Sequence, residues 1–235
     1  MVLWQIQNTA LKRYPFSKNQ HAFRKGYSCQ TAISDLVDSL EANVLRNKIS
    51  LAVFIDISGA FDNAKYSSIK SAMIKRGISP KIIAWYQQFL KQRTAFTEIK
   101  GITSSVKVQR GCPQGGILSP IIWNCIFESF IELFNGPAAS AHCYADDAAL
   151  VVHGICVSTI VDIMQMELKK AFNWGKKESL IFVASKTNAV FFHRKKKAIT
   201  PKKLTMDGKT IEYQNEVKYL GVYLDSRLTW KFHID

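Results

Sequence analysis

Apolar residues recur at helical spacing in several segments of the chain. In residues 30–48 they lie three or four positions apart, which is typical of one buried face of a helix. Ser79 and Pro80 supply an N-cap and a first-turn residue for a second helix over residues 80–93. Two further helices have a serine before them and a glycine after them. They are residues 121–135, between Ser119–Pro120 and Gly136, and residues 159–174, between Ser158 and Gly175.

Shorter segments have the composition and the turn signals of β-strands. Residues 51–57 (LAVFIDI) form a continuous apolar run, as expected of a central strand. Residues 142–153 are typical of a strand, a tight turn and a second strand, and Asp207–Gly208 marks a hairpin within residues 203–213. Single strands are expected over residues 189–193 and 217–225.

The mixture of helices, strands and hairpins predicts an α+β fold. It should contain at least one antiparallel sheet covered on one face by helices. A boundary is expected near Ser50, where a helical segment gives way to the first strand. The chain ends directly after a predicted strand, so we expect it to be part of a larger protein.

The charge of the chain adds a class of partner to this picture. Lys and Arg number 32 against 18 Asp and Glu, which gives a formal charge of +14. Such a surplus favours a polyanionic partner, with nucleic acid ahead of an anionic membrane surface. A solvated basic surface is the alternative. The hydrophobic fraction of 47% predicts a packed core rather than disorder.

Cysteine usage and the apolar segments exclude several protein classes. The chain has five cysteines and lacks a C-x-x-C pair, which argues against a disulfide framework and a zinc site of ordinary spacing. No signal-peptide core is present at the N-terminus. The longest apolar stretch, residues 117–134, contains Glu128 and Glu132, so we expect a buried helix and not a membrane span. The protein is therefore expected to be intracellular and not secreted.

Three aspartates stand where strands end. Asp56 follows the apolar run LAVFI, and Asp146 and Asp147 are adjacent inside YADDAALVV. Carboxylates this close repel one another unless a cation binds, and Mg²⁺ prefers such oxygen ligands. Two such ions support in-line phosphoryl transfer. An ordinary Asp-Asp turn is the alternative for the adjacent pair.

Other motifs bear on this choice. Residues 110–120 (RGCPQGGILSP) join a glycine-rich loop to a helix start, where backbone N–H groups can approach phosphates or bases, and Gln114 could hydrogen-bond a base or sugar. Phe61 could lie under a nucleotide sugar, and Arg24 with Lys25 could contact a phosphate backbone. The alternatives are a turn before a helix, a core aromatic and solvated charges.

Taken in order, these segments resemble the reverse transcriptase of non-LTR (LINE-type) retrotransposons, particularly Jockey-like elements. QHAFRKGYSCQTAI is similar to the fingers segment that precedes the first catalytic strand. FIDISGAFDNA is similar to polymerase motif A, RGCPQGGILSPIIWN to motif B, and YADD to motif C. ASKTNAVFF is similar to motif D, and VKYLGVYLDSRLTWKFHI to motif E and the approach to the thumb. The resemblance covers the chain from about Gln20 onward.

The resemblance implies an α+β right-hand polymerase: a palm of antiparallel sheet backed by helices, with partial fingers and without most of the thumb. It assigns residues 1–50 to partial fingers, 51–94 to palm with motif A, 95–115 to fingers and the motif B loop, 116–215 to palm with motifs B, C and D, and 216–235 to motif E and the start of the thumb connection.

The resemblance also implies roles for matching residues. Asp56, Asp146 and Asp147 would be catalytic and would bind two Mg²⁺ ions, with Mn²⁺ as an alternative. The backbone carbonyl of Ile57 would reach the second metal, and Lys186 would donate a proton to pyrophosphate. The remaining assignments concern nucleotides and nucleic acid. Phe61 would be the steric gate against ribonucleotides, Gln114 and Gly115 would contact the incoming nucleotide, and Tyr144, Arg24, Tyr219, Leu220 and Gly221 would contact primer or template.

The implied activity is RNA-directed DNA polymerisation, in which a primer 3′-OH attacks the α-phosphate of a dNTP. The partners would be an RNA template, a DNA primer and dNTPs, and no membrane partner is expected. The protein would act within a ribonucleoprotein of the retrotransposon, in the nucleus or the cytoplasm. The sequence does not indicate an oligomeric state. One contributor to duplex binding would be a basic cluster, which could equally be a nuclear-import signal or a solvated hairpin. Its members are Arg194, Lys195, Lys196, Lys197, Lys202 and Lys203.

The chain also departs from the family pattern. The upstream fingers segments and the thumb have no counterpart in it, and KKESLIFVASKT stands where a Leu/Asn/Pro-containing turn is usual. We therefore expect competent carboxylates but weak polymerisation, or none, by this chain alone. One competing hypothesis is an inactive nucleic-acid-binding remnant. The other, ranked last, is a two-metal nuclease, in which the PQG loop (residues 113–115) and Phe61 would have no role.

Overall fold

The computed structural model describes residues 1–194, 199 and 201–234. These residues form two compact units, each assembled from separated stretches of the chain. Unit 1 comprises residues 1–16, 59–128 and 178–180, and unit 2 comprises residues 17–58, 129–177 and 181 onward. The chain therefore passes between the units several times, and each unit is described by itself below.

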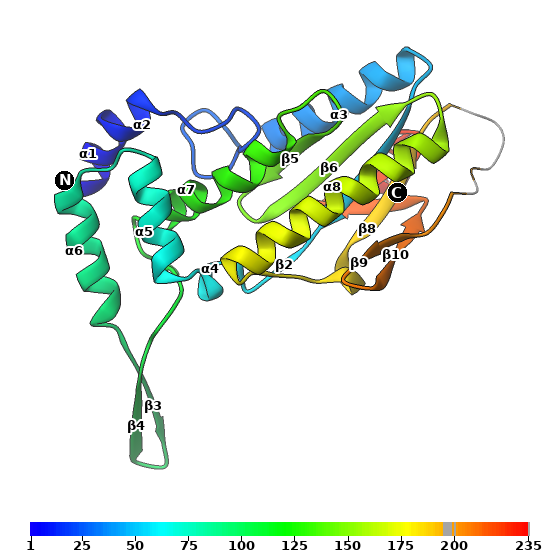
Figure 1. The fold of residues 1–235 in the computed structure, drawn as a ribbon. Coiled ribbons are helices and arrows are strands. Elements are labelled where there is room, and N and C mark those ends of the chain that lie inside the picture. Colours follow the sequence, from blue (N-terminus) through cyan, green and yellow to red (C-terminus); the bar gives the residue numbers. More distant parts are fainter. Residues whose placement is uncertain (195–198, 200, 235) are drawn as a thin grey trace. The chain divides into compact units, whose positions relative to one another are not determined.

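A six-stranded sheet forms the centre of unit 2 (Figure 1). The central strand β1 pairs antiparallel with β6 on one side and with β8 on the other, and β10 runs parallel to β8. In spatial order the strands are β5 (Ser140–Tyr144), β6 (Asp147–Gly154), β1 (Ile49–Ile55), β8 (Asn188–Phe192), β10 (Lys209–Gln214) and β9 (Leu204–Met206). The predicted α+β fold with a largely antiparallel sheet is confirmed.

Both faces of this sheet are covered. Every residue of β1 is buried, and because alternate side chains point to opposite faces, each face must be shielded. Helix α3 (Cys29–Leu45) packs on one face, where Leu40 and Phe54 belong to one buried cluster. Helix α8 (Val157–Glu178) crosses in front of the sheet in Figure 1. The predicted sheet backed by helices is confirmed, and the burial of every β1 residue means that the second face is covered as well.

The predicted helices form, but several of their ends differ from the prediction. Helix α8 begins at Val157, so Ser158 lies inside its first turn and is not its N-cap. Helix α3 begins at a capping box in which Ser28 and Thr31 satisfy each other's backbone N–H groups. Helix α7 (Ser119–Ile131) is extended by the 3-10 turn η1 (Glu132–Phe134). Helix α8 does not stop at Gly175, which is buried inside it. The chain leaves α8 at Ser179, whose φ is +58°. Gly175 is thus a packing position and not a C-cap.

Two hairpins lie near the C-terminal end of unit 2. Asp207 and Gly208 join β9 to β10, both with positive φ (+52° and +74°), which confirms the predicted Asp-Gly turn. The single strand predicted over residues 217–225 is wrong. This segment is a hairpin of β11 (Glu216–Tyr219) and β12 (Val222–Asp225). Its turn residues, Leu220 and Gly221, again both have positive φ (+48° and +86°).

The remaining short elements of unit 2 connect the sheet to its surroundings. The pair β2 (Ile57–Ser58) and β7 (Ile181–Phe182) is antiparallel and follows directly on β1. The 3-10 turn η2 (Ala184–Lys186) precedes β8, and α9 (Lys231–Ile234) follows β12.

Unit 1 is mainly helical. Its helices are α1 (Val2–Asn8), α2 (Ala10–Arg13), α4 (Ala60–Asn63), α5 (Tyr66–Lys75), α6 (Pro80–Lys91) and the first ten residues of α7. Helix α6 begins at Pro80, as predicted. A hairpin of β3 (Thr94–Ile99) and β4 (Ile102–Lys107) projects from the end of α6 in Figure 1, and all its strand residues are exposed. The sequence did not indicate this hairpin, since its strands bury no face.

The compact units do not follow the segment boundaries suggested by the sequence. Ser50, where a boundary is expected, is fully buried inside β1. The labels palm and fingers for the segments remain a prediction. Within the described part of the chain, no helix is both long enough and apolar enough to span a membrane.

Candidate active site

Asp56 stands at the end of the central strand of unit 2. It lies between β1 and β2, and its backbone carbonyl accepts a hydrogen bond from the Val183 N–H at 3.0 Å. The next residue, Ile57, is buried and pairs with Phe182. Asp56 is thus fixed by strand pairing on both sides of it along the chain.

The adjacent pair lies at the tip of the β5–β6 hairpin. Tyr144 and Asp147 pair across its end, so Ala145 and Asp146 form a two-residue turn. In the β1–β6 register Ile55 pairs with Ala148, which brings the Asp56 end of β1 level with the Asp147 end of β6. Asp56 and the Asp146–Asp147 pair, about ninety positions apart in the sequence, therefore lie at one end of the sheet.

The charges of these aspartates are coupled. Burial, followed by the charge of Asp56, raises the pKa of Asp146, while a backbone hydrogen bond partly opposes this. Burial, then the charges of Asp146 and Asp56, raises the pKa of Asp147 to about 6. Like charges in a partly desolvated site oppose each other's ionisation, so a cation would relieve the repulsion.

The donor atoms suit a hard divalent cation. Asp56 Oδ2 is shielded from solvent and accepts no hydrogen bond from the described residues. Across those residues, no group of three or more His, Cys, Asp and Glu side chains is arranged to enclose a metal ion alone. Mg²⁺ does not require such a cage, because it usually takes one or two carboxylates and completes its shell with water and substrate phosphates. One or two of these aspartates could therefore serve as ligands of a divalent cation in an open site.

Lys186 reaches the same cluster. Its Nζ lies 3.5 Å from Asp56 Oδ2, and the lysine side chain is 67% exposed. It stands in η2, which β7 and β8 hold beside the end of β1. An exposed ammonium group at this position offsets part of the negative charge while remaining accessible to a phosphate.

Phe61 and Gln114 belong to unit 1. The Phe61 ring stacks on Trp123 of α7, with centroids 5.2 Å apart and planes inclined by 28°. Trp123 is fully buried and stacks in turn on Phe127. Gln114 Nε2 donates to both carboxylate oxygens of Asp62, at 2.9 and 3.0 Å. The Phe61 ring is thus supported by its stack on Trp123, and the Gln114 side chain is held by the Asp62 carboxylate.

The loop that carries Gln114 is tied to the Phe61 segment through its backbone. The Cys112 N–H donates to the Phe61 carbonyl at 2.8 Å, and the Gly111 N–H to the Ala64 carbonyl at 2.7 Å. A Cβ on Gly111 would lie 2.8 Å from the Asp62 carbonyl oxygen, so the close approach requires glycine there. Gly115 has φ +77°, and a Cβ built there would meet nothing within 4 Å.

Two of the residues expected to contact nucleic acid in unit 2, Arg24 and Tyr219, already form hydrogen bonds within the chain. Arg24 donates to the carbonyls of Ser17 and Gln20, at 2.5 and 2.7 Å, so much of its capacity is used within its own loop. Tyr219 is buried and donates its hydroxyl to the His142 carbonyl. A primer contact from that segment would come from the Leu220–Gly221 turn.

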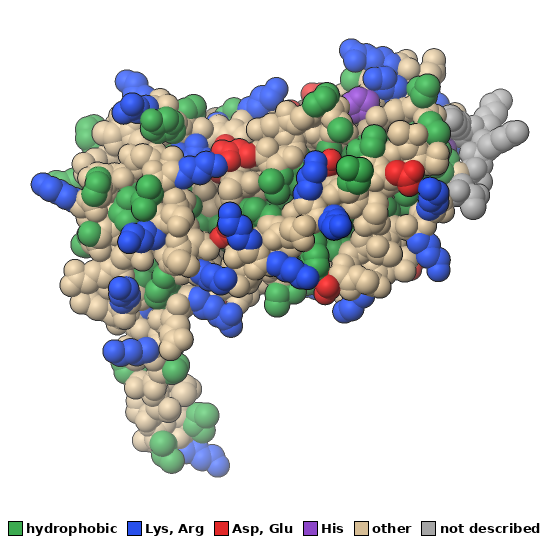
Figure 2. Space-filling view, viewed as in Figure 1, with side chains coloured by type: hydrophobic (Ala, Val, Ile, Leu, Met, Phe, Trp, Pro, Cys, Tyr) green, Lys and Arg blue, Asp and Glu red, His purple; other side chains and the backbone are tan. Residues whose placement is uncertain are grey.

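The basic cluster lies only partly within the structure. Lys195, Lys196 and Lys197 lie outside the described residues. Lys202 is described, and its Nζ forms an ion pair with Asp162 at 3.1 Å. On the face shown in Figure 2, Lys and Arg side chains are spread widely and Asp and Glu are sparse.

Three residues that position the candidate site had no assigned role in the sequence. Gln20 hydrogen-bonds the backbone of Ala145 beside the aspartate pair. Asp62 binds Gln114, and Trp123 supports Phe61. Asp62 directly follows Phe61, so its position next to a candidate residue could have indicated its role. Nothing in the sequence pattern indicates the contacts of Gln20 or Trp123, because both partners are remote along the chain.

A family model decides what kind of protein has this arrangement. The model described as reverse transcriptase (RNA-dependent DNA polymerase) matches residues 2–224. The chain belongs to the reverse transcriptase family. The likeness extends to curated relatives from non-LTR retrotransposons, which confirms the resemblance drawn from the motifs. Reverse transcriptases generally use divalent metals and copy RNA templates, which agrees with the open carboxylate site.

Two relatives illustrate the likeness. The chain is 26% identical over 217 residues to the "Retrovirus-related Pol polyprotein from type-1 retrotransposable element R1" of Bradysia coprophila, which covers 92% of the chain and 21% of the relative. It is 27% identical over 224 residues to the "RNA-directed DNA polymerase from mobile element jockey" of Drosophila funebris, with coverages of 92% and 24%. The chain thus spans about a quarter of the length of these relatives or less.

Solved structures agree on the fold. Apo telomerase from Candida tropicalis, truncated from its C-terminal domain, has a TM-score of 0.67 at 13% identity, covering 97% of this chain and 44% of that one. The same telomerase in complex with the TWJ fragment of telomeric RNA has a TM-score of 0.67 at 12% identity, with coverages of 98% and 36%. At these identities the likeness concerns the fold alone, and it confirms the reverse transcriptase-like architecture.

Proposed function

We propose that this reverse transcriptase chain provides the polymerase centre that adds dNTPs to a DNA primer on an RNA template. The observation that carries the proposal is the meeting of Asp56, Asp146 and Asp147 at one end of the unit 2 sheet, where Asp56 contributes to raising the pKa of the other two. A cluster of mutually repelling, partly buried carboxylates is costly to maintain. It is readily explained by divalent metal binding.

Asp56 and Asp146 would be the principal ligands, with Asp147 to the side and the Ile57 carbonyl as a further donor. Two bound Mg²⁺ ions would supply an activated primer hydroxyl and charge stabilisation at the reacting phosphate. The chain's own residues contribute position and charge. In the reaction the primer 3′-OH loses its proton to water, its oxygen bonds to the α-phosphorus and the bond to pyrophosphate breaks. Lys186 donates a proton to the leaving group and is reprotonated from water.

Unit 1 would recognise the nucleotide. The Phe61 ring, supported by Trp123, acts as the steric gate that disfavours a ribose 2′-OH. Gln114 and Gly115 contact the incoming base pair, with Gln114 exchanging its bond to Asp62 for one to the nucleotide. This exchange is modest in free energy, since Gln114 and Asp62 are both exposed.

The basic surplus would hold the template–primer duplex through its phosphates. Tyr144, Arg24, and the Leu220–Gly221 turn beside Tyr219 are the proposed contacts in unit 2. The widespread Lys and Arg side chains on the face in Figure 2 support this role. Binding of this kind is largely independent of sequence and falls steeply with salt.

Single-nucleotide incorporation tests the proposal. The purified chain is given an RNA template, a DNA primer, a labelled dNTP and Mg²⁺. We expect slow, Mg²⁺-dependent incorporation that Asp146→Asn lowers by about 10³-fold, because several kcal/mol of charge stabilisation are lost. The matched control is Asp162→Asn, an exposed aspartate of the same unit that pairs with Lys202. It should leave the rate unchanged.

The other outcomes separate the competing hypotheses. Equal loss in Asp146→Asn and Asp162→Asn would contradict the assignment of the site. No incorporation, together with salt-sensitive duplex binding, would favour the inactive remnant. Mg²⁺-dependent shortening of the primer would favour a nuclease.

A further inference from the structure

The turn that carries the aspartate pair contains an unfavourable backbone conformation. Ala145 has a φ of +56° and is buried in the two-residue turn between β5 and β6. A non-glycine residue rarely adopts positive φ, because its Cβ crowds the backbone. The conformation persists only if surrounding contacts stabilise it. These contacts also decide how the next two residues, Asp146 and Asp147, are presented.

One side chain supplies those contacts. Gln20 is fully buried, and its amide contacts both backbone groups of Ala145. Its Nε2 donates to the Ala145 carbonyl at 3.1 Å, and its Oε1 accepts from the Ala145 N–H at 3.0 Å. The same Oε1 also accepts from the Ala22 N–H at 3.1 Å. The two bonds to Ala145 fix the orientation of that residue's backbone more tightly than a single bond could.

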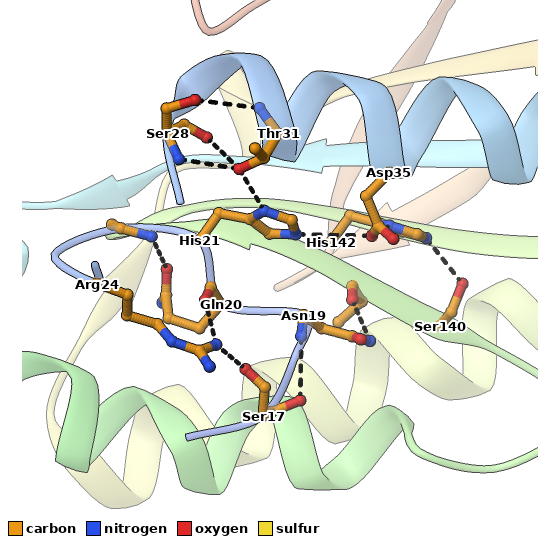
Figure 3. Close-up of polar contacts among 12 residues, drawn as sticks. Ser17, Asn19, Gln20, His21, Arg24, Ser28, Thr31, Asp35, Ser140 and His142 are labelled. Atoms are coloured by element: carbon orange, nitrogen blue, oxygen red, sulfur yellow. Dashed lines mark hydrogen bonds and ion pairs between the residues drawn. The ribbon is translucent and has the colours of Figure 1, made fainter. Parts of the chain in front are cut away.

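Gln20 is itself held firmly. The His21 N–H donates to the Cys143 carbonyl and the Cys143 N–H to the Asn19 carbonyl, each at 2.9 Å, so this loop lies along β5 like a short extra strand. Asn19 Nδ2 donates to the Ala141 carbonyl at 2.8 Å, and Arg24 donates to the Gln20 carbonyl. Figure 3 shows Asn19, Gln20 and Arg24 on this one loop.

A second set of contacts anchors the loop to α3. On the loop, His21 Nδ1 lies 2.9 Å from Thr31 Oγ1, and His21 Nε2 lies 3.7 Å from Asp35 Oδ2. Asp35 also contacts β5, where His142 Nδ1 lies 2.6 Å from Asp35 Oδ2. In Figure 3 His21, Asp35 and His142 point toward one another beside Gln20. The loop is therefore fixed both to β5 and to a helix, which gives the Gln20 amide a rigid base.

We propose that Gln20 is a positioning residue for metal binding, which holds Ala145 at positive φ so that Asp146 and Asp147 are presented toward Asp56. The inference deepens the proposed function and rests on it for the role of the carboxylates. Gln20 touches neither substrate nor metal; it acts through the backbone of the turn. Without it, Ala145 would relax toward negative φ and the carboxylates would spread over several orientations.

The same unit contains a matched control. Gln165 Nε2 donates to the Thr205 carbonyl and Gln165 Oε1 accepts from the Thr205 N–H, each at 2.9 Å. This is the same bidentate arrangement on a backbone remote from the aspartates. Gln20→Met removes both bonds to the Ala145 backbone and the bond from the Ala22 N–H. Gln165→Met removes both bonds to the Thr205 backbone and a longer one from the Thr205 hydroxyl, and both substitutions nearly conserve volume. Only Gln20→Met is expected to affect the aspartate turn.

The first readout needs no metal. Hydrogen exchange at the Ala145 amide, measured by NMR, should become at least about tenfold faster in Gln20→Met and stay unchanged in Gln165→Met. Unchanged exchange in a folded Gln20→Met variant overturns the inference, whatever the activity of the protein. If Gln20→Met does not fold, Gln20→Asn, which keeps an amide but is too short to reach both groups, is measured instead under the same criterion.

The second readout is Mn²⁺ affinity, measured from the free-ion EPR signal. Gln20→Met should weaken binding about tenfold relative to wild type and to Gln165→Met. Adding Ala145→Gly should recover part of the loss, since glycine adopts positive φ without help. Equal affinity in all variants overturns the positioning role. A wild-type chain that binds no Mn²⁺ contradicts the proposed function, and the hydrogen exchange then still decides whether Gln20 fixes the turn.

Discussion

The carboxylate end of unit 2 and the Gln114 loop of unit 1 are held in place by different kinds of structure. Asp56 and Asp147 end neighbouring strands whose register is fixed over seven consecutive residue pairs. Gln114 lies in a loop tied by single backbone hydrogen bonds and by a contact with Asp62. A strand register can change only by moving many residues together, whereas a loop can exchange one contact at a time.

This difference indicates a division of labour. Groups that stabilise charge during the reaction must keep fixed positions, which suits the ends of paired strands. Groups that recognise successive nucleotides must engage and release them, which suits a loop. We therefore expect substitutions in the carboxylate end to abolish turnover and substitutions in the loop to alter nucleotide affinity and selectivity.

The largest expected effect comes from comparing Asp56→Asn with Gln114→Ala. Asp56→Asn should lower kcat by about 10³-fold, because a ligand and several kcal/mol of charge stabilisation are lost. Gln114→Ala should raise the KM for dNTP by about tenfold, equivalent to one hydrogen bond, with a smaller change in kcat. Steady-state incorporation kinetics measure both. If Gln114→Ala lowered mainly kcat and left KM for dNTP nearly unchanged, the proposed distinction between the carboxylate end and the Gln114 loop would be wrong.

The next largest effect is expected on stability, at Gly111, where the Gln114 loop closely approaches the Phe61 segment. Gly111→Ala places a Cβ against the Asp62 carbonyl oxygen at φ +91°, so we expect a loss of about 2–3 kcal/mol in unfolding free energy. Gly101→Ala, at φ +78° on the β3–β4 hairpin with open space around it, should lose only about 1 kcal/mol. Urea denaturation followed by the fluorescence of the tryptophans measures the difference. Equal losses of unfolding free energy in the two variants would mean that the backbone at Asp62 can shift to accept the added Cβ at little cost.

The same contrast explains how far the sequence could predict the structure. Strands with continuous apolar runs, such as β1, and the Asp207–Gly208 turn follow from local pattern. The three aspartates each stand at a predicted strand end as well. Strand ends alone left an ordinary Asp-Asp turn open, and the resemblance of the surrounding segments to motifs A and C is what grouped the three residues.

Features that depend on remote partners could not be predicted. The buried role of Gln20 depends on Ala145, 125 positions away. The exposed β3–β4 hairpin has no buried face to produce a periodic pattern. Helix α8 continues past Gly175 because that glycine packs in the interior, and packing outweighs the local tendency of glycine to end a helix. The turn at Leu220–Gly221 was missed because leucine seldom adopts positive φ.

The support of the steric gate should tune selectivity. Trp123→Phe shortens the stack beneath Phe61, so the ring gains freedom to move away from a 2′-OH. We expect discrimination between dNTP and the matching ribonucleotide to fall by about tenfold, measured as the ratio of their kcat/KM values. Phe127→Leu, one ring further from Phe61, is the control for lost core packing. It should lower stability with little change in selectivity, and an equal fall in both variants would speak against a specific role for Trp123.

The smallest effect concerns the repulsion within the carboxylate end itself. The folded pKa of Asp147 is raised to about 6 by burial and by Asp146 and Asp56, so its contribution to stability is present below the unfolded pKa and lost as pH rises through about 6. Asp147→Asn should therefore raise the melting temperature of the metal-free chain at pH 7.5 but not at pH 4. Because Asp147 is only partly desolvated and much of its side chain is open to solvent, the gain should be about 1 kcal/mol or less after solvent screening.

Thermal unfolding at the two pH values, with and without Mg²⁺, measures this gain. Mg²⁺ should stabilise the wild type more than the Asp147→Asn variant, because the ion relieves a repulsion that the variant has already lost. Asp162→Asn, whose carboxylate pairs with Lys202, should show no such gain at pH 7.5. If Asp147→Asn stabilised the chain equally at pH 4 and pH 7.5, the cause would be packing and not charge. The carboxylate end would then lose the electrostatic strain that distinguishes it from the Gln114 loop.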